Sequence, residues 1–250
     1  MKSMCARLLL PACVLATAAC TPLPPRSPQA PEWLGSPNYN SRKANFVVLH
    51  HTGDNDAATA LATLTSSTQH VSAHYLVGRN GKVWQLVDEN ARAWHAGAAR
   101  WGTTTDINSV SIGIELDNNG SEAYPDSQID ALLLLLEDVR KRNGIPRANV
   151  LGHGDIAPGR KFDPGVLFPW KRLASRGFGL WCEAPGLPLA DGVNLALGLQ
   201  LLGYDMTRPD AALAAFRRHY RQLEIATAAD DEDQAMVQCL LRQRTPVTPP

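Results

Sequence analysis

The feature that most constrains the fold of this chain is a pair of continuous apolar runs that end in groups able to do chemistry. Phe46–Leu49 runs into the histidine pair His50–His51, and Val110–Leu116 contains Glu115 near its end. A run without polar alternation is typical of a strand that is buried on both faces of a sheet. The end of such a strand lies inside the protein, where a charged group needs a partner or a function.

Helix and strand patterns alternate through residues 41–182. Asn80-Gly81 accepts positive φ and therefore predicts a hairpin turn at Arg79–Lys82. Such alternation predicts an α/β fold built on a layered sheet. The other elements that we predict are a helix at 56–67, strands at 73–77 and 83–87, and a helix at about 128–142 that Pro125, Asp126 and Ser127 cap and Asn143–Gly144 ends.

Residues that can bind a metal lie at the edges of these elements. His50 ends a strand, Val150–Leu151 is expected to lead into a glycine-rich loop that holds His153, and Asp163 follows. Two imidazoles and a carboxylate suit zinc, and three protein ligands with a fourth position left for water are typical of a catalytic site. Spacing alone leaves open that the histidines are satisfied core or capping residues.

The composition changes after Trp181. Pro185, Gly186 and Pro188 predict a linker, and two amphipathic helical patterns follow at 194–202 and 209–223. We therefore predict a small helical domain at residues 186–240, with a flexible tail rich in Pro and Thr at 241–250.

The N-terminus has the organisation of an export signal. Lys2 and Arg7 precede an apolar stretch from Leu8 to Ala19. The stretch is too short to span a membrane, which takes about 20 apolar residues. Residues 1–19 are therefore predicted to be a signal peptide; a frayed cytosolic N-terminus is the alternative.

The end of this signal resembles the lipobox of bacterial lipoproteins. Ala18-Ala19-Cys20 carries the resemblance, although Thr17 stands where Leu is usual. The resemblance implies a lipid anchor on Cys20, followed by a proline-rich tether at 20–40. Because Thr21 is not Asp, the expected location is the outer membrane of a Gram-negative bacterium, with the protein facing the periplasm.

The composition of the whole chain excludes one class of partner. The 24 acidic and 24 basic residues, with no long run of one sign, give no electrostatic basis for binding nucleic acid. A length of 250 residues with 44% hydrophobic composition can bury a sizeable core, and we expect a monomer. Cys182 and Cys239 remain in an oxidising compartment after signal removal, and we hypothesise a disulfide between them.

Four blocks of sequence resemble the successive signatures of the type 2 N-acetylmuramoyl-L-alanine amidases. They occur in the family's order over roughly residues 44–173. The resemblance implies a mixed central β-sheet flanked by helices and one zinc ion per chain, bound by His50, His153 and Asp163. His51 faces the other side of its strand by parity, so we expect a structural or supporting role for it. The four blocks are Leu49–Thr52, Val71–Tyr75, Ser111–Leu116 and Gly152–Gly165.

The resemblance also implies roles for two catalytic residues. Glu115 is expected to take a proton from metal-activated water and to hand it to the leaving amine. A buried ion pair is the alternative for this carboxylate. Lys161 is expected to stabilise the tetrahedral oxyanion beside the metal, with a plain surface lysine as the alternative.

Substrate contacts are expected beside these blocks. Arg160 has the chemistry to clamp a peptide carboxylate bidentately, and a solvated arginine is the alternative. Trp94 or Trp101 offers a face on which a sugar can stack. The blocks that resemble the family's substrate groove contain His74, Tyr75, Trp94 and His95, for which core packing is the alternative.

The helical segment at 186–240 resembles the three-helix peptidoglycan-binding module found beside many wall hydrolases. The resemblance lies in Val193–Leu197, Leu201–Tyr204 and Ala214–Tyr220. Such a module would hold polymer near the active site and raise the effective concentration of substrate. A stabilising cap is the alternative.

The sequence therefore predicts an amidase that cuts between the muramic acid lactyl group and L-Ala of peptidoglycan or muropeptides. A recognition protein of the same fold that binds without cutting is the alternative, and the presence of Glu115 and Lys161 beside a complete ligand set favours the enzyme. A zinc peptidase or other hydrolase ranks last, because neither His-Glu-x-x-His nor Gly-x-Ser-x-Gly occurs.

Overall fold

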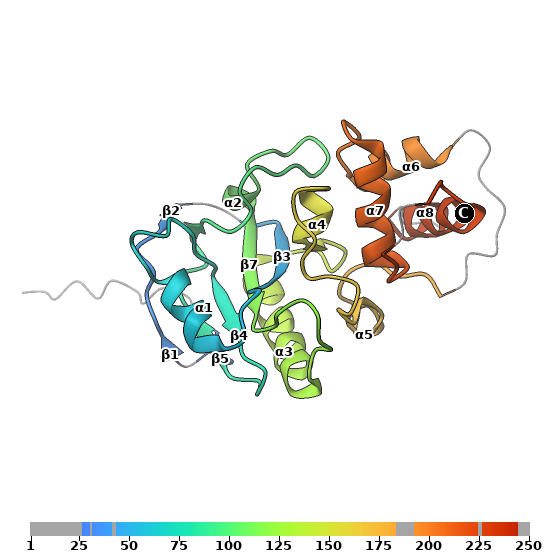
Figure 1. Cartoon of the computed structure of the whole chain (residues 1–250). Helices are drawn as coiled ribbons and strands as arrows, with labels where there is room; N and C mark the ends of the chain where they lie inside the picture. The colour runs from blue at the N-terminus through green and yellow to red at the C-terminus, as the bar shows by residue number, and fades with distance from the viewer. Residues whose placement is uncertain (1–26, 31, 42–43, 184–192, 225–226, 245–250) are drawn as a thin grey trace, which may run out of the picture.

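The core of the protein is a six-stranded mixed sheet. A mixed central sheet flanked by helices is what the family resemblance implied. The computed structural model describes residues 27–30, 32–41, 44–183, 193–224 and 227–244 (Figure 1). The sheet order is β1-β5-β4-β7-β3-β8, and all neighbours are parallel except β4 and β5. The strands are β1 Glu32–Trp33, β3 Phe46–His51, β4 Tyr75–Val77, β5 Val83–Gln85, β7 Ser111–Leu116 and β8 Val150–Gly152, with β2 Tyr39–Ser41 and β6 Ala91–Ala93 forming a separate antiparallel pair.

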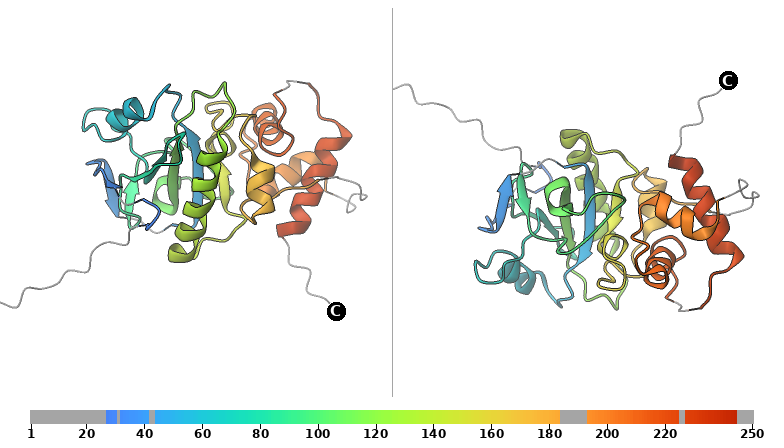
Figure 2. Two further views of the ribbon diagram at one scale, coloured as in Figure 1. Left: turned by 90° about the horizontal axis from the view of Figure 1, so that it is seen from below. Right: turned by 90° about the horizontal axis from the view of Figure 1, so that it is seen from above.

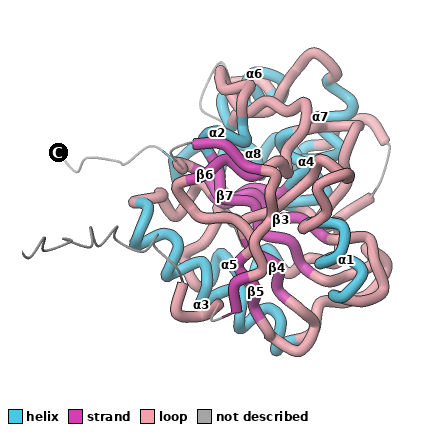
Figure 3. The backbone as a smooth tube through the Cα atoms, turned by 90° about the vertical axis from the view of Figure 1, so that its left-hand side faces the viewer, coloured by secondary structure: helices cyan, strands magenta, loops and turns pink. Residues whose placement is uncertain are grey.

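The two apolar runs of the sequence are the central strands β3 and β7. They pair in parallel, with His50 opposite Glu115. Alternate residues of a strand point to opposite faces, so Val47 and Leu49 join one buried cluster while Val48 joins another. His50 therefore shares a face with Val48. Figure 3 shows the strands running through the middle of the molecule with helices outside them.

One face of the sheet is covered by α3, Asp126–Asn143, and α5, Trp170–Ser175. Gly144 ends α3 at a φ of +67°, as the Asn-Gly pair predicted. The predicted side-chain cap at the start of α3 is wrong. The Ser127 hydroxyl donates instead to the carbonyl of Arg79, at 2.7 Å, and so ties the helix to the β4–β5 hairpin.

The other face carries α1, α2 and α4. Helix α1, Ala57–Leu64, begins where predicted, because the Asp56 carboxylate accepts from the amide of Thr59 at 2.8 Å. Helix α2, Ile107–Val110, leads directly into β7. The glycine-rich loop expected after β8 is instead a short helix, α4, His153–Ile156. Asp155 starts this helix by accepting from the Gly152 amide at 2.7 Å.

The C-terminal part of the chain forms three helices, α6 Leu195–Leu202, α7 Pro209–Tyr220 and α8 Asp231–Arg244. They gather at one end of the molecule, opposite β1 and α1 (Figure 2). Leu199, Phe216 and Leu240 from these helices share a buried cluster with Val48 and Leu151 of the sheet. The helices thus continue the core of the sheet.

Two predicted boundaries are wrong. The tether does not extend to residue 40, because β1 pairs with β5 and the Ser36 amide donates to the carbonyl of Leu86 at 2.8 Å. The flexible tail does not begin at 241, because α8 continues to Arg244. The signal at 1–19, Cys20, the linker at 184–192 and the last six residues lie outside the described residues. Within the described part of the chain, no helix is both long and apolar enough to cross a membrane.

A disulfide joins Cys182 to Cys239 on α8, as hypothesised from the sequence. Cys182 follows the part of the chain that forms the sheet and the helices α1 to α5, here called the sheet domain. The two Cα atoms are 6.3 Å apart, and 57 positions separate the residues in the chain. The bond therefore closes a long loop that contains α6 and α7. Cross-links of this kind stabilise mainly by restricting the unfolded chain.

Removing this cross-link should destabilise the protein. We expect the double variant Cys182→Ala/Cys239→Ala to lose about 2–4 kcal/mol of unfolding free energy, measured by denaturant titration. Reductant should lower the stability of the native chain by a similar amount and leave the double variant unchanged. Equal sensitivity of both chains to reductant would contradict the assignment.

Candidate metal centre and active site

Three side chains from separate elements converge on one point. His50 comes from the end of β3, His153 from the start of α4, and Asp163 from the loop that follows α4. The two Nδ1 atoms are 2.9 Å apart, and Asp163 Oδ2 lies 3.1 Å from that of His50 and 3.0 Å from that of His153. Ligands that each bond one ion at about 2.0–2.2 Å lie at about such mutual distances. Among the described residues this is the one group of its kind able to hold a metal ion.

The contacts of the His153 ring show that a cation fits this point. Its Nε2 lies 3.0 Å from the carbonyl oxygen of Ala96, and a carbonyl can only accept. The neutral ring therefore carries its proton on Nε2 and presents a lone pair from Nδ1. That lone pair faces the Asp163 carboxylate, a second acceptor. Acceptors in contact repel unless a cation lies between them, so the donor set fits a metal ion.

Electrostatics lower the pKa values of His50 and Asp163. Burial, together with the neighbouring His153, lowers the pKa of His50 to about 4. Burial alone would raise the pKa of Asp163, but its close contacts with the imidazoles of His153 and His50 outweigh burial and bring that pKa below its usual range. Metal ligands must be deprotonated, so both groups are ready to bind at neutral pH.

His95 contacts the nitrogen of His50 that faces away from the metal-binding group. Its Nδ1 lies 3.0 Å from His50 Nε2, and its Nε2 lies 3.2 Å from the hydroxyl of Ser111. Gly113 of β7 makes room for this ring, because a Cβ there would lie 2.4 Å from His95 Cγ. Partners of this kind fix the orientation and tautomer of a ligand histidine.

Glu115 faces the cluster from the neighbouring strand. It is the register partner of His50, and its Oε2 is buried without a hydrogen-bond partner among the described residues. Burial raises its pKa to about 8, and the negative charge of Asp163 adds to the increase. The buried ion pair considered from the sequence is not formed within the described chain. An unpartnered carboxyl beside a metal-binding cluster is typical of a catalytic acid or base.

A cavity of about 310 Å³ opens over these residues. His50, His153, Asp163 and Glu115 line it together with Lys161, as the sequence predicted for a shared site. Its apolar wall comes from α1 and the segment before β4. That wall is made of Ala60, Leu64 and Val71.

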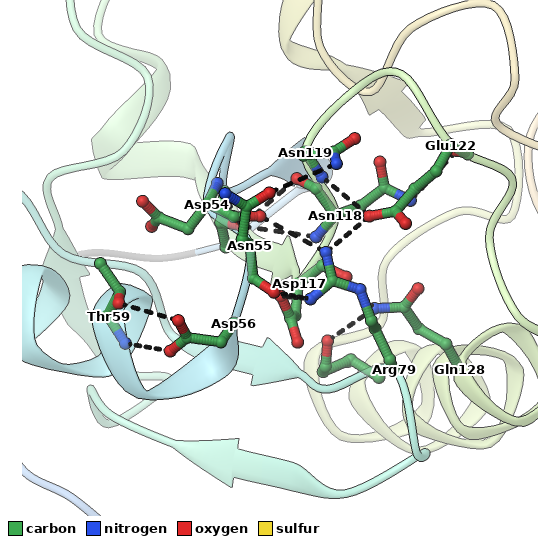
Figure 4. Close-up of polar contacts among 12 residues, drawn as sticks. Asp54, Asn55, Asp56, Thr59, Arg79, Asp117, Asn118, Asn119, Glu122 and Gln128 are labelled. Carbon is green, nitrogen blue, oxygen red and sulfur yellow. Dashed lines mark hydrogen bonds and ion pairs between the residues drawn. The ribbon is translucent and has the colours of Figure 1, made fainter.

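A polar network fixes the rim of the cavity. Arg79 donates to the Asp117 carboxylate, to Glu122 and to the carbonyl of Asn55, each at 2.6 Å (Figure 4). Asn55 lies in the loop after β3, while Asp117 and Glu122 lie in the loop after β7. One guanidinium therefore holds together the two loops that follow the strands of His50 and Glu115. Asp54 of the first loop lines the cavity.

The structure separates the residues expected in the substrate groove. Trp94 and His95 line the cavity, but His74 and Tyr75 do not. His74 lies between the Ala91 carbonyl and the Gly113 amide, at 3.0 Å from each. Tyr75 is fully buried on the face of α3, and its hydroxyl donates to Glu89 at 2.5 Å. The groove prediction is therefore wrong for His74 and Tyr75, both of which hold the sheet together.

Two other residues predicted to contact substrate, Trp101 and Arg160, do not line this cavity. Trp101 is 6% exposed and its ring meets Tyr204 edge-on, so it offers no face to a sugar. Arg160 donates to the Ala96 carbonyl at 2.6 Å and lies 3.4 Å from His153 Nε2. It borders a second cavity rather than the one over Glu115.

His51 lies outside the metal-binding group, as parity predicted. Its ring packs over Gly120, where a Cβ would lie 2.6 Å from His51 Cε1. Sequence reasoning missed the Ala96 carbonyl, the Arg79 network and the role of Gly113. Gly113 gave one signal, since glycine inside a buried strand often marks the close approach of another group.

Several known proteins are similar to this chain in sequence. The family model for N-acetylmuramoyl-L-alanine amidase matches residues 40–166. The N-acetylmuramoyl-L-alanine amidase AmiD of Escherichia coli is 39% identical over 235 residues, which cover 80% of this chain and 83% of AmiD. The 1,6-anhydro-N-acetylmuramyl-L-alanine amidase AmpD of Haemophilus influenzae is 41% identical over 106 residues, or 42% of this chain and 58% of AmpD.

Two solved structures are similar over most of the chain. AmiD of E. coli in complex with anhydro-N-acetylmuramic acid-L-Ala-D-γ-Glu-L-Lys gives a TM-score of 0.70 at 39% identity, covering 80% of this chain and 89% of that one. AMPDH3 of Pseudomonas aeruginosa in complex with anhydromuramic pentapeptide gives a TM-score of 0.70 at 32% identity. The alignment covers 82% of this chain and 93% of AMPDH3. The share of this chain that each structure covers is larger than the family match at residues 40–166.

Glu115 should make the stability of the metal-free protein depend on pH. The folded chain keeps the Glu115 proton to about pH 8, whereas the unfolded chain releases it near the ordinary pKa of 4.5. Stability due to Glu115 is therefore full below pH 4.5 and falls by up to about 1.4 kcal/mol per pH unit as pH rises to 8. His50 acts oppositely between about pH 4 and 6.5, so the informative quantity is a difference between variants.

The measurement is denaturant unfolding of chelator-treated native protein and of Glu115→Gln from pH 5 to 8. The native-minus-variant difference in unfolding free energy should decrease steadily over this range. A difference that does not change with pH would show that Glu115 is ionised throughout.

Proposed function

The chain belongs to the N-acetylmuramoyl-L-alanine amidase family, and we propose that it is a zinc enzyme that cuts the amide between the lactyl group of muramic acid and L-Ala. The observation that carries the proposal is the convergence of three ligand atoms within 3.1 Å of one another beside the unpartnered carboxyl of Glu115. The three side chains that can bind a cation and the carboxyl of Glu115, which can accept a proton, therefore line the same cavity.

The residues that would hold zinc are His50, His153 and Asp163. Two nitrogen donors and one carboxylate are a usual set for catalytic zinc. The chemistry that zinc supplies when bound is a more acidic water and a polarised substrate carbonyl. His95 and the Ala96 carbonyl would keep the two imidazoles in the tautomers that binding requires.

Glu115 would move the proton. A cation at the neighbouring cluster would lower its pKa from about 8 and make the carboxylate available as a base at neutral pH. It would accept a proton from water and pass that proton to the amine of L-Ala as the amide breaks. Lys161 lines the same cavity and would stabilise the oxyanion of the tetrahedral intermediate.

The substrate class that we propose is the muropeptide, either free or within peptidoglycan. The two similar structures hold an anhydro-muramyl tripeptide and an anhydromuramic pentapeptide. A recognition protein that binds without cutting is the second candidate. The cavity argues for the enzyme, since binding alone gives no role to a buried carboxyl that lacks a partner.

We also propose the cellular setting that the sequence indicated. Residues 1–19 would direct export, Cys20 would carry the lipid, and the monomeric protein would face the periplasm from the outer membrane. The Cys182–Cys239 disulfide supports an oxidising compartment. The helices α6 to α8 would bind peptidoglycan, and their shared core with the sheet also gives them the stabilising role of a cap.

The direct test of the activity is mass analysis of a defined muropeptide after incubation with the full chain. We expect release of the free peptide and the free muramic sugar, loss of this activity on chelation, and recovery with zinc. Tight binding of an uncut muropeptide by the zinc-loaded protein would favour the recognition protein instead.

Lys161 has a matched control on the surface. We expect Lys161→Ala to lower kcat by about 100-fold, because a charge aimed at the oxyanion acts mainly in the transition state. Lys171→Ala should retain the native kcat, since Lys171 is exposed and pairs with Glu183. A native kcat in both variants would identify Lys161 as a plain surface lysine.

A further inference from the structure

A second cavity, of about 480 Å³, lies where α4 and the loop before α2 meet the start of α7. The loop reaches the helical part of the chain, because the Gly102 amide donates to the carbonyl of Gly203 at 2.7 Å (Figure 1). The cavity is therefore built from both the sheet domain and the C-terminal helices. It lies apart from the cavity over Glu115, and the two share no lining residue.

Three arginines line this second cavity. Arg100 comes from the loop before α2, Arg160 follows α4, and Arg208 immediately precedes α7. All three are solvent-exposed residues. None of their guanidinium groups pairs with a carboxylate within the described part of the chain. Three unpaired cations around one concave surface form a site for an anion.

Two glycines allow the arginines to approach closely. A Cβ at Gly159 would lie 2.9 Å from Nη1 of Arg208, and a Cβ at Gly97 would lie 3.4 Å from Nη1 of Arg160. The guanidinium of Arg208, from the helical part, therefore rests on the residue just before Arg160 of the sheet domain. The site is assembled only when these two parts of the chain are docked.

The one acidic residue that lines the cavity is Asp205. Its Oδ1 accepts from the Thr207 amide at 3.1 Å and so shapes the turn before α7. It forms no ion pair with the arginines among the described residues. The lining thus has three positive charges and one negative charge, together with the hydroxyls of Thr105 and Thr207.

Arg160 links this cavity to the reaction centre. Its Nη2 is 3.4 Å from Nε2 of His153, whose opposite nitrogen belongs to the metal-binding group. Arg160 therefore lies on the side of the His153 ring that faces away from the metal-binding group.

We propose that Arg100, Arg160 and Arg208 form a carboxylate-binding site for the acidic stem peptide of the substrate, so that the C-terminal helices help to select it. This inference rests on the proposed amidase function. A glutamate joined through its γ-carboxyl, as in the ligand of the similar AmiD structure, leaves its α-carboxylate free. The C-terminus of the peptide adds a second anion. Arginine binds such carboxylates through paired N–H groups.

The test compares two substrates with the full chain. One is anhydro-N-acetylmuramic acid-L-Ala-D-γ-Glu-L-Lys, and the other is the same molecule with both peptide carboxylates amidated. We expect Arg100→Gln/Arg208→Gln to raise KM about tenfold for the acidic substrate, with kcat unchanged and with little effect on the amidated one. Arg242→Gln, on the exposed side of α8, removes a charge elsewhere and should change neither KM.

A rise in KM of equal size for both substrates, or no rise for either, would overturn the carboxylate site. A separate binding experiment distinguishes this outcome from failure of the amidase proposal. Calorimetry with the free peptide L-Ala-D-γ-Glu-L-Lys should show binding to the native chain that the double variant and amidation of the peptide each weaken. If the native chain cuts neither substrate, the amidase proposal fails. Peptide binding that is equally strong with and without the free carboxylates would refute the carboxylate site, whatever the outcome for the amidase activity.

Discussion

The parallel pairing of β3 with β7 is the constraint on which the site depends. Its register sets His50 beside Glu115, and the alternation of the strands puts both side chains on the face away from α3. A slip of one residue would turn His51 toward the cluster and bury His50 against the core. The apolar residues that precede these two groups hold the register, because Val47, Leu49, Ile112 and Ile114 are all at most 1% exposed.

The C-terminal helices belong to the same physical unit as the sheet. They share a buried cluster with Val48 and Leu151, and the disulfide at Cys239 fixes α8 to the end of the sheet domain. Asp155, two residues after His153, accepts hydrogen bonds from Tyr204 at 2.7 Å and lies 2.6 Å from Nδ1 of His219. The helices therefore contact the segment that carries a metal ligand, which a loosely tethered binding module would not do.

Sequence reasoning succeeded where one residue type has one strong local preference. The buried strands, the Asn-Gly turns and the disulfide were predicted, and the structure brings together the three ligand residues that the signature blocks indicated. It failed where tertiary contacts decide. Tyr75 has a polar tip that could face a groove, yet it lies on the α3 face because of strand parity, and its hydroxyl meets Glu89 of the loop after β5. No local pattern reveals that partner, nor the docking that places Arg208 over Gly159.

The central claim is that one zinc ion occupies the point where β3, α4 and the following loop meet. The most direct measurement is anomalous diffraction at the zinc edge from crystals of the full chain supplied with zinc. The account predicts one strong peak about 2.0–2.2 Å from His50 Nδ1, His153 Nδ1 and a carboxylate oxygen of Asp163. A zinc peak elsewhere in the chain, or none in this cavity, would contradict it.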